Sequence, residues 1–187
     1  MAIEEAALDL FEEQGYEATT VDQIAARAEV ATATLFRYFS SKAELLVSEK
    51  NEALPAIRQA VIDRPPEENG LEAIRHAVLG EWVPAIDPLL TARRARIVGT
   101  SDQLSGLSYH RGRSWLLELG DALAQRQGVA PGDERCVLVV RIALATMASA
   151  VEGWIARGCD GDLGDAIAAG FDLAAEVLAD LSARSAT

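Results

Sequence analysis

Apolar residues recur with a helical period along the N-terminal part of the chain. The first stripe predicts an amphipathic helix that ends at Gly15, a glycine suited to the position after a helix. A second stripe covers 21–28, and either Thr19 or Thr20 can cap its first turn. After a tight turn, a third short helix covers 32–38. The pattern therefore predicts a trihelical unit that contains a helix-turn-helix.

Longer helices are predicted in the middle of the chain. Ser41 and Glu44 match a capping box, so a helix is expected from there to about Asp63, bent where Pro55 removes a hydrogen bond. The Pro-Pro segment 64–70 predicts a loop. Further helical patterns, the first two separated by prolines, cover 71–82, 89–98 and 103–127.

The last two predicted helices are the most apolar. One opens at Asp133 and ends at Gly158, and Arg141 is the single charge within its apolar stretch 137–151. That stretch is shorter than the roughly 20 residues that a bilayer requires, so a helix buried on all sides is expected rather than a membrane span. The final helix covers 163–181, and its apolar stripe requires a partner.

Composition favours an all-α protein with a sizeable core. Half of the 187 residues are apolar, mainly Ala, Leu and Val, and runs of alternating β-branched residues are short. Cys136 and Cys159 are too few for a disulfide scaffold, and the acidic N-terminus does not resemble a signal peptide. A cytoplasmic protein with reduced thiols and no membrane association is expected.

The charge balance restricts how the chain could bind nucleic acid. The formal net charge is −12, which excludes a protein that coats nucleic acid by bulk electrostatics. DNA binding by the N-terminal unit would depend on a few cations gathered on one face. Such binding should be specific and sensitive to salt.

Two strings resemble a known family. They read Gly-Tyr-Glu-Ala-Thr-Thr-Val-Asp-Gln-Ile-Ala-Ala-Arg-Ala over 15–28 and Thr-Leu-Phe-Arg-Tyr-Phe-Ser-Ser-Lys-Ala-Glu-Leu over 34–45. At nearly every position they resemble the DNA-binding signature of the TetR family of transcriptional regulators. The resemblance implies a homodimer that represses genes by binding a palindromic operator of double-stranded DNA, with 32–38 in the major groove.

The resemblance also implies which residues touch DNA. By position they are Thr20, Tyr38 and Lys42 for phosphates, and Thr32, Ala33, Thr34 and Arg37 for the base-facing surface. Phe36 on that surface replaces the usual Tyr, so a hydroxyl contact is expected to be missing. Arg37 is best suited to read a base, through a bidentate pair with guanine.

Three departures from the family pattern lie around this motif. Glu29 replaces the usual Gly of the turn, and a positive φ there would cost on the order of 1 kcal/mol. Ala31 replaces the usual Ser or Thr cap, at a cost of roughly 1 kcal/mol. The family also carries several Arg or Lys before the first helix. Either such an arm precedes the given sequence or the affinity for DNA is modest.

Beyond Leu45 the resemblance is architectural. It implies a DNA-binding domain over 1–45 and a ligand-binding and dimerisation domain over 46–187. The Pro-Pro loop, the Arg-rich helix and Asp160-Gly-Asp-Leu163 resemble a subgroup with an acyl-CoA-like ligand-binding domain, so the expected effector is small and hydrophobic. The residues expected around it are Trp82, Ile86, Trp115, Leu119 and Arg141.

Arg141 has a second interpretation. A charge in a buried helix requires a compensating group, so it pairs either with a protein carboxylate or with the polar part of a ligand.

Dimerisation is expected through the last two helices, packed as a four-helix bundle with a second copy. Small side chains would allow close approach; they are Ala145, Ala148, Ala150, Gly170 and Ala174.

No constellation predicts catalysis or metal binding. Glu72 and His76 have a spacing that could ligate a metal, but no third ligand is evident. The three aspartates of 160–165 suggest a calcium loop, yet the late glutamate is replaced by Phe171, so an N-cap is the better interpretation. No enzyme activity, cofactor or metal is predicted.

The leading hypothesis is a ligand-responsive transcriptional regulator, a repressor released from its operator by the effector. In the expected mechanism the effector wedges among the middle helices and swings the helix kinked at Pro55. The alternative is a helical small-molecule-binding protein whose DNA-binding unit is weak or vestigial. A helical-bundle enzyme is the third class.

Overall fold

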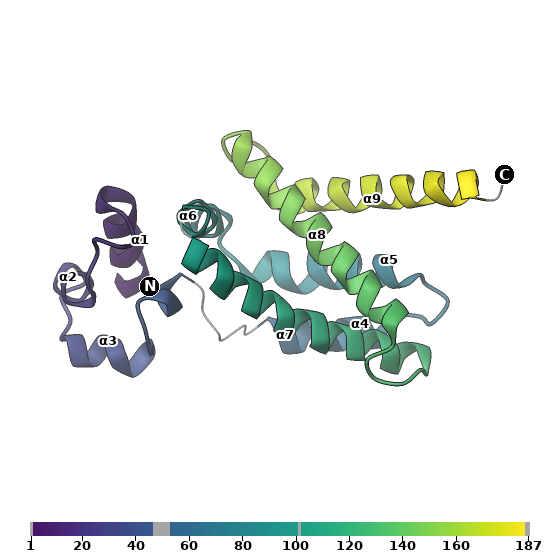
Figure 1. Cartoon of the computed structure of the whole chain (residues 1–187), viewed down its shortest axis with the longest axis horizontal. Helices are drawn as coiled ribbons and strands as arrows, with labels where there is room; N and C mark the ends of the chain where they lie inside the picture. Colours follow the sequence, from purple (N-terminus) through teal and green to yellow (C-terminus); the bar gives the residue numbers. More distant parts are fainter. Residues whose placement is uncertain (1, 47–52, 101, 186–187) are drawn as a thin grey trace. The chain divides into compact units, whose positions relative to one another are not determined.

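The computed structural model describes residues 2–46, 53–100 and 102–185, and its regular elements are helical throughout these ranges, which confirms the all-α prediction (Figure 1). The helices are α1 (Ala2–Gln14), α2 (Val21–Arg27), α3 (Thr32–Tyr38), α4 (Leu54–Asp63), α5 (Gly70–Ala77), α6 (Pro88–Val98), α7 (Asp102–Gln127), α8 (Glu134–Ala156) and α9 (Leu163–Ser185). Three short turns of helix are η1 (Ala43–Leu45), η2 (Val78–Trp82) and η3 (Val83–Ala85).

The chain divides into two compact units that are each built from separate segments. The first comprises Met1–Asn51 and Leu89–Arg111, and the second comprises Glu52–Pro88 and Gly112–Thr187. By packing, therefore, α6 and the start of α7 belong with the three N-terminal helices. The sequence-based division after residue 45 remains a prediction about function.

The first unit has its own hydrophobic core. Leu8 of α1, Ile24 of α2 and Leu35 of α3 are fully buried in it. Ile97 of α6 and Leu104 of α7 complete the same cluster. Burial of apolar surface at about 25 cal/mol per Å² makes these contacts the main stabilising force between the helices. The helix-turn-helix is thus covered by two helices that come much later in the chain.

Ion pairs reinforce the contact between α1 and α6. Arg93 of α6 places Nη2 at 2.6 Å from both Asp9 Oδ1 and Glu12 Oε2. Its hydrogen bonds to Glu12 and then to Asp9 raise the pKa of the guanidinium further above its usual range. Arg94 adds a pair with Glu4, at 3.0 Å. These contacts hold the acidic helix α1 against the Arg-rich helix.

The segment after the helix-turn-helix differs from the prediction. The Ser41 hydroxyl accepts a hydrogen bond from the Glu44 amide at 3.3 Å, as predicted, but only the short turn η1 follows. The predicted bend at Pro55 is wrong, because α4 begins at Leu54 and Pro55 lies in its first turn. There the missing N–H has no helical acceptor to lose. The remainder of the predicted helix, 47–52, lies outside the described residues.

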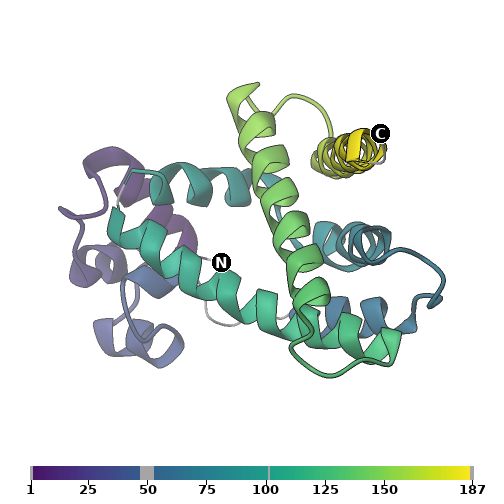
Figure 2. The same ribbon diagram turned by 45° about the vertical axis from the view of Figure 1, so that its right-hand side comes forward.

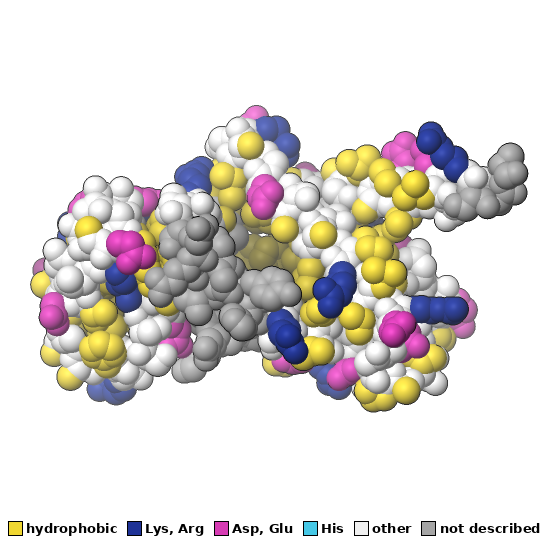
Figure 3. Space-filling model, viewed as in Figure 1, with side chains coloured by type: hydrophobic (Ala, Val, Ile, Leu, Met, Phe, Trp, Pro, Cys, Tyr) yellow, Lys and Arg dark blue, Asp and Glu magenta, His cyan; other side chains and the backbone are white. Residues whose placement is uncertain are grey.

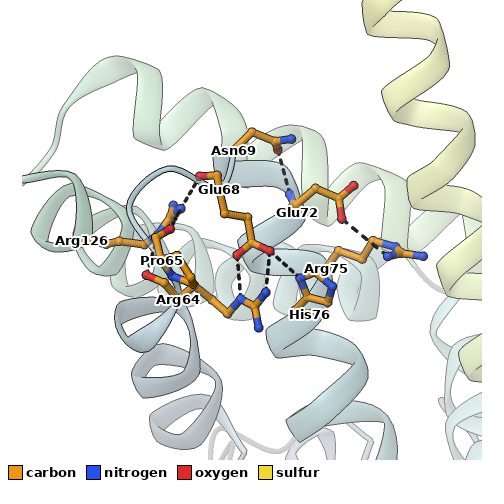
Figure 4. Close-up of polar contacts among 8 residues, drawn as sticks. All are labelled: Arg64, Pro65, Glu68, Asn69, Glu72, Arg75, His76 and Arg126. Atoms are coloured by element: carbon orange, nitrogen blue, oxygen red, sulfur yellow. Dashed lines mark hydrogen bonds and ion pairs between the residues drawn. The ribbon is translucent and has the colours of Figure 1, made fainter.

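A buried arginine anchors the Pro-Pro loop in the second unit (Figure 4). Arg126 of α7 is 9% exposed. Its Nε donates to the carbonyls of Arg64 and Pro65 at 3.2 Å, and its Nη2 donates to the carbonyls of Pro65, at 2.5 Å, and Glu68. The Glu68 side chain bonds to Arg64, which lowers the pKa of the Glu68 carboxyl. One guanidinium therefore holds the backbone of 64–68 in place.

The apolar helix α8 is not buried on all sides, which corrects the prediction. By length and composition alone it could cross a membrane, but only one stripe of its side chains is buried inside the chain. Arg141 follows the buried Val140 and is therefore turned by about 100° away from that stripe, so it is exposed. An exposed guanidinium needs no buried carboxylate partner, so the ion-pair interpretation of Arg141 loses its basis in the single chain. Leu138 is also exposed, at 57%.

Helices α8 and α9 pack on one another (Figure 2), and α9 leaves an apolar face uncovered. A Cβ added at Gly170 would lie 3.1 Å from the Ala150 Cβ, so these two small residues serve the contact within the chain rather than one with a second copy. Beyond Phe171 the stripe on α9 emerges into solvent, and apolar side chains follow the helix in Figure 3. The exposed residues are Leu173, Val177, Leu178 and Leu181.

Candidate nucleic-acid interface

Thr20 fixes the start of α2. Its hydroxyl accepts a hydrogen bond from the Gln23 amide at 3.2 Å, and the Thr20 amide donates to Gln23 Oε1 at 2.8 Å. This is a capping box, so Thr20 is the cap of the two that the sequence allowed. Thr19 is buried instead, and its hydroxyl donates to the carbonyls of Leu10 and Gly15. Thr20 is therefore exposed at the beginning of α2, and its phosphate contact remains a prediction.

The turn between α2 and α3 contains the two residues that depart from the family pattern, Glu29 and Ala31. Glu29 has φ 55°, in the left-handed region where a side chain costs on the order of 1 kcal/mol. Ala31 is the N-cap of α3 and supplies no side-chain hydrogen bond. The turn is nevertheless closed by backbone hydrogen bonds, including one from the Val30 amide to the Ala25 carbonyl at 2.9 Å.

Helix α3 separates a buried residue from an exposed polar face. Leu35 is fully buried in the core of the first unit. Ala33, Phe36, Arg37 and Tyr38 are exposed, and Thr32 and Thr34 are half-buried at the side of this face. The structure thus brings the predicted base-facing residues together on one surface of one helix. Whether they touch DNA remains a prediction.

Arg37 and Tyr38 form a pair on that surface. The Arg37 guanidinium lies 4.9 Å from the centre of the Tyr38 ring, and its Nη2 donates to the Tyr38 hydroxyl at 3.2 Å. Both side chains are exposed. A guanidinium held against an aromatic ring loses less rotamer freedom when it binds, while most of its N–H groups remain available for a base or a phosphate.

Lys42 is committed to contacts inside the unit. Its Nζ donates to the carbonyls of Tyr16 and Thr19 at 2.6 and 2.9 Å and lies 4.1 Å from the centre of the Tyr16 ring. Burial raises the pKa of the Tyr16 phenol. An ammonium has three N–H donors, so one remains for the predicted phosphate contact. Sequence reasoning missed the main role of Lys42, which is to hold the α1–α2 connector.

The other basic residue of the helix-turn-helix is also engaged. Arg27 forms a bidentate pair with Glu13, at 2.8 and 3.1 Å. This hydrogen bonding lowers the pKa of the Glu13 carboxyl. Within the described part of α1 to α3, Arg37 is therefore the cation that pairs with no carboxylate.

One hydrogen bond across the helix-turn-helix was not predicted. The Thr32 hydroxyl donates to Asp22 Oδ1 at 2.8 Å, linking the first residue of α3 to the first turn of α2. The missing cap at Ala31 could have indicated this hydrogen bond, because a recognition helix without a capping side chain needs another polar contact in its first turn.

Comparison with known proteins decides the family. The model of the tetR family of bacterial regulatory proteins matches residues 3–48, and that of the MftR C-terminal domain matches residues 68–179, more than half of the chain. The transcriptional regulator TcmR of Streptomyces glaucescens is 33% identical over 182 residues, covering 92% of this chain and 79% of that protein. The chain belongs to the TetR family. It is accordingly a ligand-responsive, DNA-binding transcriptional regulator.

Solved structures share the fold of this TetR-family chain. SmeT of Stenotrophomonas maltophilia in complex with triclosan is 18% identical, with a TM-score of 0.64 over 94% of this chain and 89% of that one. The regulator FadR of Bacillus subtilis in complex with stearoyl-CoA is 22% identical, with a TM-score of 0.52 over 93% and 96% of the two chains. At these identities the likeness establishes the architecture alone.

The TetR-family ligand residues expected from sequence fall in the second unit. Trp82 and Trp115 meet edge to face, with ring centroids 6.4 Å apart. Leu119 is fully buried on the same helix as Trp115, and Ile86 is half-buried. Trp115 is 7% exposed, and its Nε1 has no hydrogen-bond partner. The structure brings the two tryptophans together, whereas Arg141 lies on an exposed part of α8.

The weaker metal candidates have other partners. Glu72 pairs with Arg75, and His76 Nδ1 lies 2.8 Å from Glu68 Oε1. Asp162 accepts a hydrogen bond from the Asp165 amide at 2.9 Å, so it caps α9. The N-cap interpretation is confirmed for Asp162.

Proposed function

We propose that the chain is a cytoplasmic repressor that binds a palindromic DNA operator as a homodimer and releases it when a small hydrophobic effector binds. The observation that carries the DNA-binding part is the exposed face of α3, on which Arg37 and Tyr38 stand beside Thr32 and Thr34. Small hydroxyls and a guanidinium match the donor and acceptor pattern of a major groove. No catalytic role belongs to the proposal.

Arg37→Ala tests this assignment. On DNA flanking its own gene, the variant is expected to lose about 1–3 kcal/mol of binding free energy and its preference at one base pair. Fluorescence anisotropy with permuted operators measures both quantities. Arg37→Lys is the matched control, because it keeps the charge but not the bidentate fork, so base preference should fall more than affinity. An unchanged binding isotherm for Arg37→Ala would remove α3 from the interface.

The proposed dimer uses α8 and α9. Four large apolar side chains of α9 and Leu138 of α8 are exposed in the single chain. Contiguous exposed apolar surface on a helix pair marks a protein interface, and a symmetric operator requires two recognition helices. The exposed Ala145 and Ala148 on α8 would allow the second copy to approach closely.

The proposed effector site adjoins the two tryptophans. Their rings supply an apolar wall, and the Trp115 indole N–H is a buried donor without a partner in the chain. Triclosan, found in the SmeT structure, is a largely apolar ligand, and stearoyl-CoA, found in the FadR structure, joins a long apolar acyl chain to the polar, negatively charged coenzyme A. A long-chain acyl-CoA is therefore the first effector to test.

Stearoyl-CoA is expected to release the operator, and Trp82→Ala is expected to weaken this response roughly tenfold by removing an aromatic wall. DNA affinity without effector should not change. Effector titrations of a preformed operator complex measure the response, with Glu81→Gln, at the exposed neighbour of Trp82, as control. Equal responses of both variants would place the site elsewhere.

One set of contacts favours the alternative of a sequestering protein. Arg27 and Lys42 are both engaged inside the first unit, which leaves little positive charge for phosphates. Tight effector binding without retention of any fragment of flanking DNA would establish that alternative.

A further inference from the structure

We propose that Asp22 and Thr32 form an acceptor-only pair that selects a base with an exocyclic amino group, adenine or cytosine, at one operator position. The inference rests on the proposed DNA-binding function. It assigns a specificity-determining role to Asp22, which lies on α2 rather than on the recognition helix. The juxtaposition that carries it is the hydrogen bond from the Thr32 hydroxyl to Asp22 Oδ1, at 2.8 Å.

The pair occupies the point where α3 enters the proposed groove. Thr32 is the first residue of α3, directly after the uncapped Ala31. Within the described part of the chain, no other side-chain hydrogen bond links α2 to α3. Asp22 is exposed and Thr32 is half-buried, so the carboxylate remains accessible beside the hydroxyl. The tether therefore positions Thr32 before DNA arrives.

The direction of the hydrogen bond determines what Thr32 can recognise. An ionised carboxylate can only accept hydrogen bonds. The single proton of the Thr32 hydroxyl is therefore used in its hydrogen bond to Asp22. Hydrogen bonds to an ionised acceptor are roughly twice as strong as neutral ones, which favours retention of this arrangement in the complex. What Thr32 presents outward is its remaining oxygen lone pairs. Phosphate oxygens, guanine O6 and N7 and thymine O4 also only accept, and none of them can bond to it.

Two base edges in the major groove can satisfy the pair. Adenine N6 and cytosine N4 carry amino groups, and each can donate to the Thr32 oxygen or to a free lone pair of Asp22. A carboxylate beside a groove repels the phosphates, so Asp22 is tolerated best where a base amino group compensates it. Selection against guanine and thymine follows from the same charge, since their acceptor atoms would face a carboxylate.

The test measures binding of the full-length protein to operator variants with all four bases at each half-site position. At one position the unmodified protein is expected to bind adenine or cytosine roughly 5- to 100-fold more tightly than guanine or thymine. Asp22→Ala frees the Thr32 proton, so the hydroxyl can also donate. That preference should fall below about threefold, while preferences at the other positions persist.

Two further variants separate specificity from folding. Thr32→Val keeps the shape but removes the hydroxyl, and it should lose the same preference at the same position. Asp22→Asn retains an acceptor for Thr32 but removes the charge and adds an amide donor, so it should keep only part of the preference for an amino group. Glu5→Ala, on an exposed position of α1, removes one negative charge without touching the pair and controls for non-specific attraction.

The outcomes are distinct. A uniform loss of affinity in Asp22→Ala, with every base preference intact, would show a merely structural tether and overturn the inference. A preference for guanine or thymine at the position sensitive to Thr32→Val would overturn it as well. If the unmodified protein, folded by circular dichroism, bound no DNA fragment, the proposed function itself would fail.

Discussion

Replacing Leu173 by glutamate is expected to convert the protein to a monomer. Leu173 is 60% exposed on the apolar face of α9, beside Val177 and Leu181, which are 49% and 57% exposed. In a symmetric dimer the substitution places two unpaired charges in the interface core, and each such charge costs several kcal/mol. The dimer dissociation constant should rise at least about 100-fold. Sedimentation equilibrium measures it directly.

Leu117→Glu is the matched control for this experiment. Leu117 of α7 is 54% exposed and lies outside the α8–α9 face, so the same change should leave the dimer intact. Operator affinity provides a second measurement, because a monomer presents one α3 instead of two. A Leu173→Glu protein that sediments as the unmodified one does would exclude this face as the dimer interface.

Arg126→Met is expected to destabilise the second unit by about 2–4 kcal/mol. The methionine keeps much of the apolar stem but removes every hydrogen bond to the carbonyls of Arg64, Pro65 and Glu68. Those carbonyls lose a charged donor, whose hydrogen bonds are worth more than neutral ones. Urea unfolding followed by circular dichroism measures the loss as a lower transition midpoint.

Two other arginine variants calibrate that loss. Arg126→Lys retains the charge but lacks the planar fork, so it should recover only part of the stability. Arg58→Met removes a guanidinium whose exposed contact to Gln125 spans 3.4 Å, and it should change the free energy of unfolding by less than about 0.5 kcal/mol. Equal midpoints for Arg126→Met and Arg58→Met would contradict the anchoring role.

The helices themselves were predictable, because their signals are local. The glycine after α1, the aspartate that caps α8 and the apolar periods lie within a few residues of the backbone they control. The bend at Pro55 failed for a related reason. Its effect depends on whether the helix has already begun, and α4 begins only one residue earlier. At Ser41 the hydroxyl accepts from the Glu44 amide, as a capping box requires, whereas the Glu44 carboxylate accepts from the Ser40 amide, one residue before the predicted position.

The residues of the candidate interface could be predicted from the sequence motif, but the hydrogen bonds and ion pairs that they make could not. The exposed face of α3 follows from its period and from the family signature. The partners of Arg27 and Lys42 do not follow from either signal, since they lie 14 to 26 residues away along the chain. The full burial predicted for α8 is not observed within the single chain, because an apolar helix can face its own core on one side and solvent or a second copy on the other. Arg141 lies on the uncovered side.

The packing of α6 against α1 bears on how such regulators can be recombined. The core of the DNA-reading unit includes Ile97, and Arg93 neutralises two carboxylates of α1. A chimera joined after residue 45 would combine the helix-turn-helix of this chain with the α6 of another protein. It would lose the packing of Ile97 and the ion pairs of Arg93. A DNA-binding unit that could be transferred with its core intact therefore consists of two separate pieces of the chain.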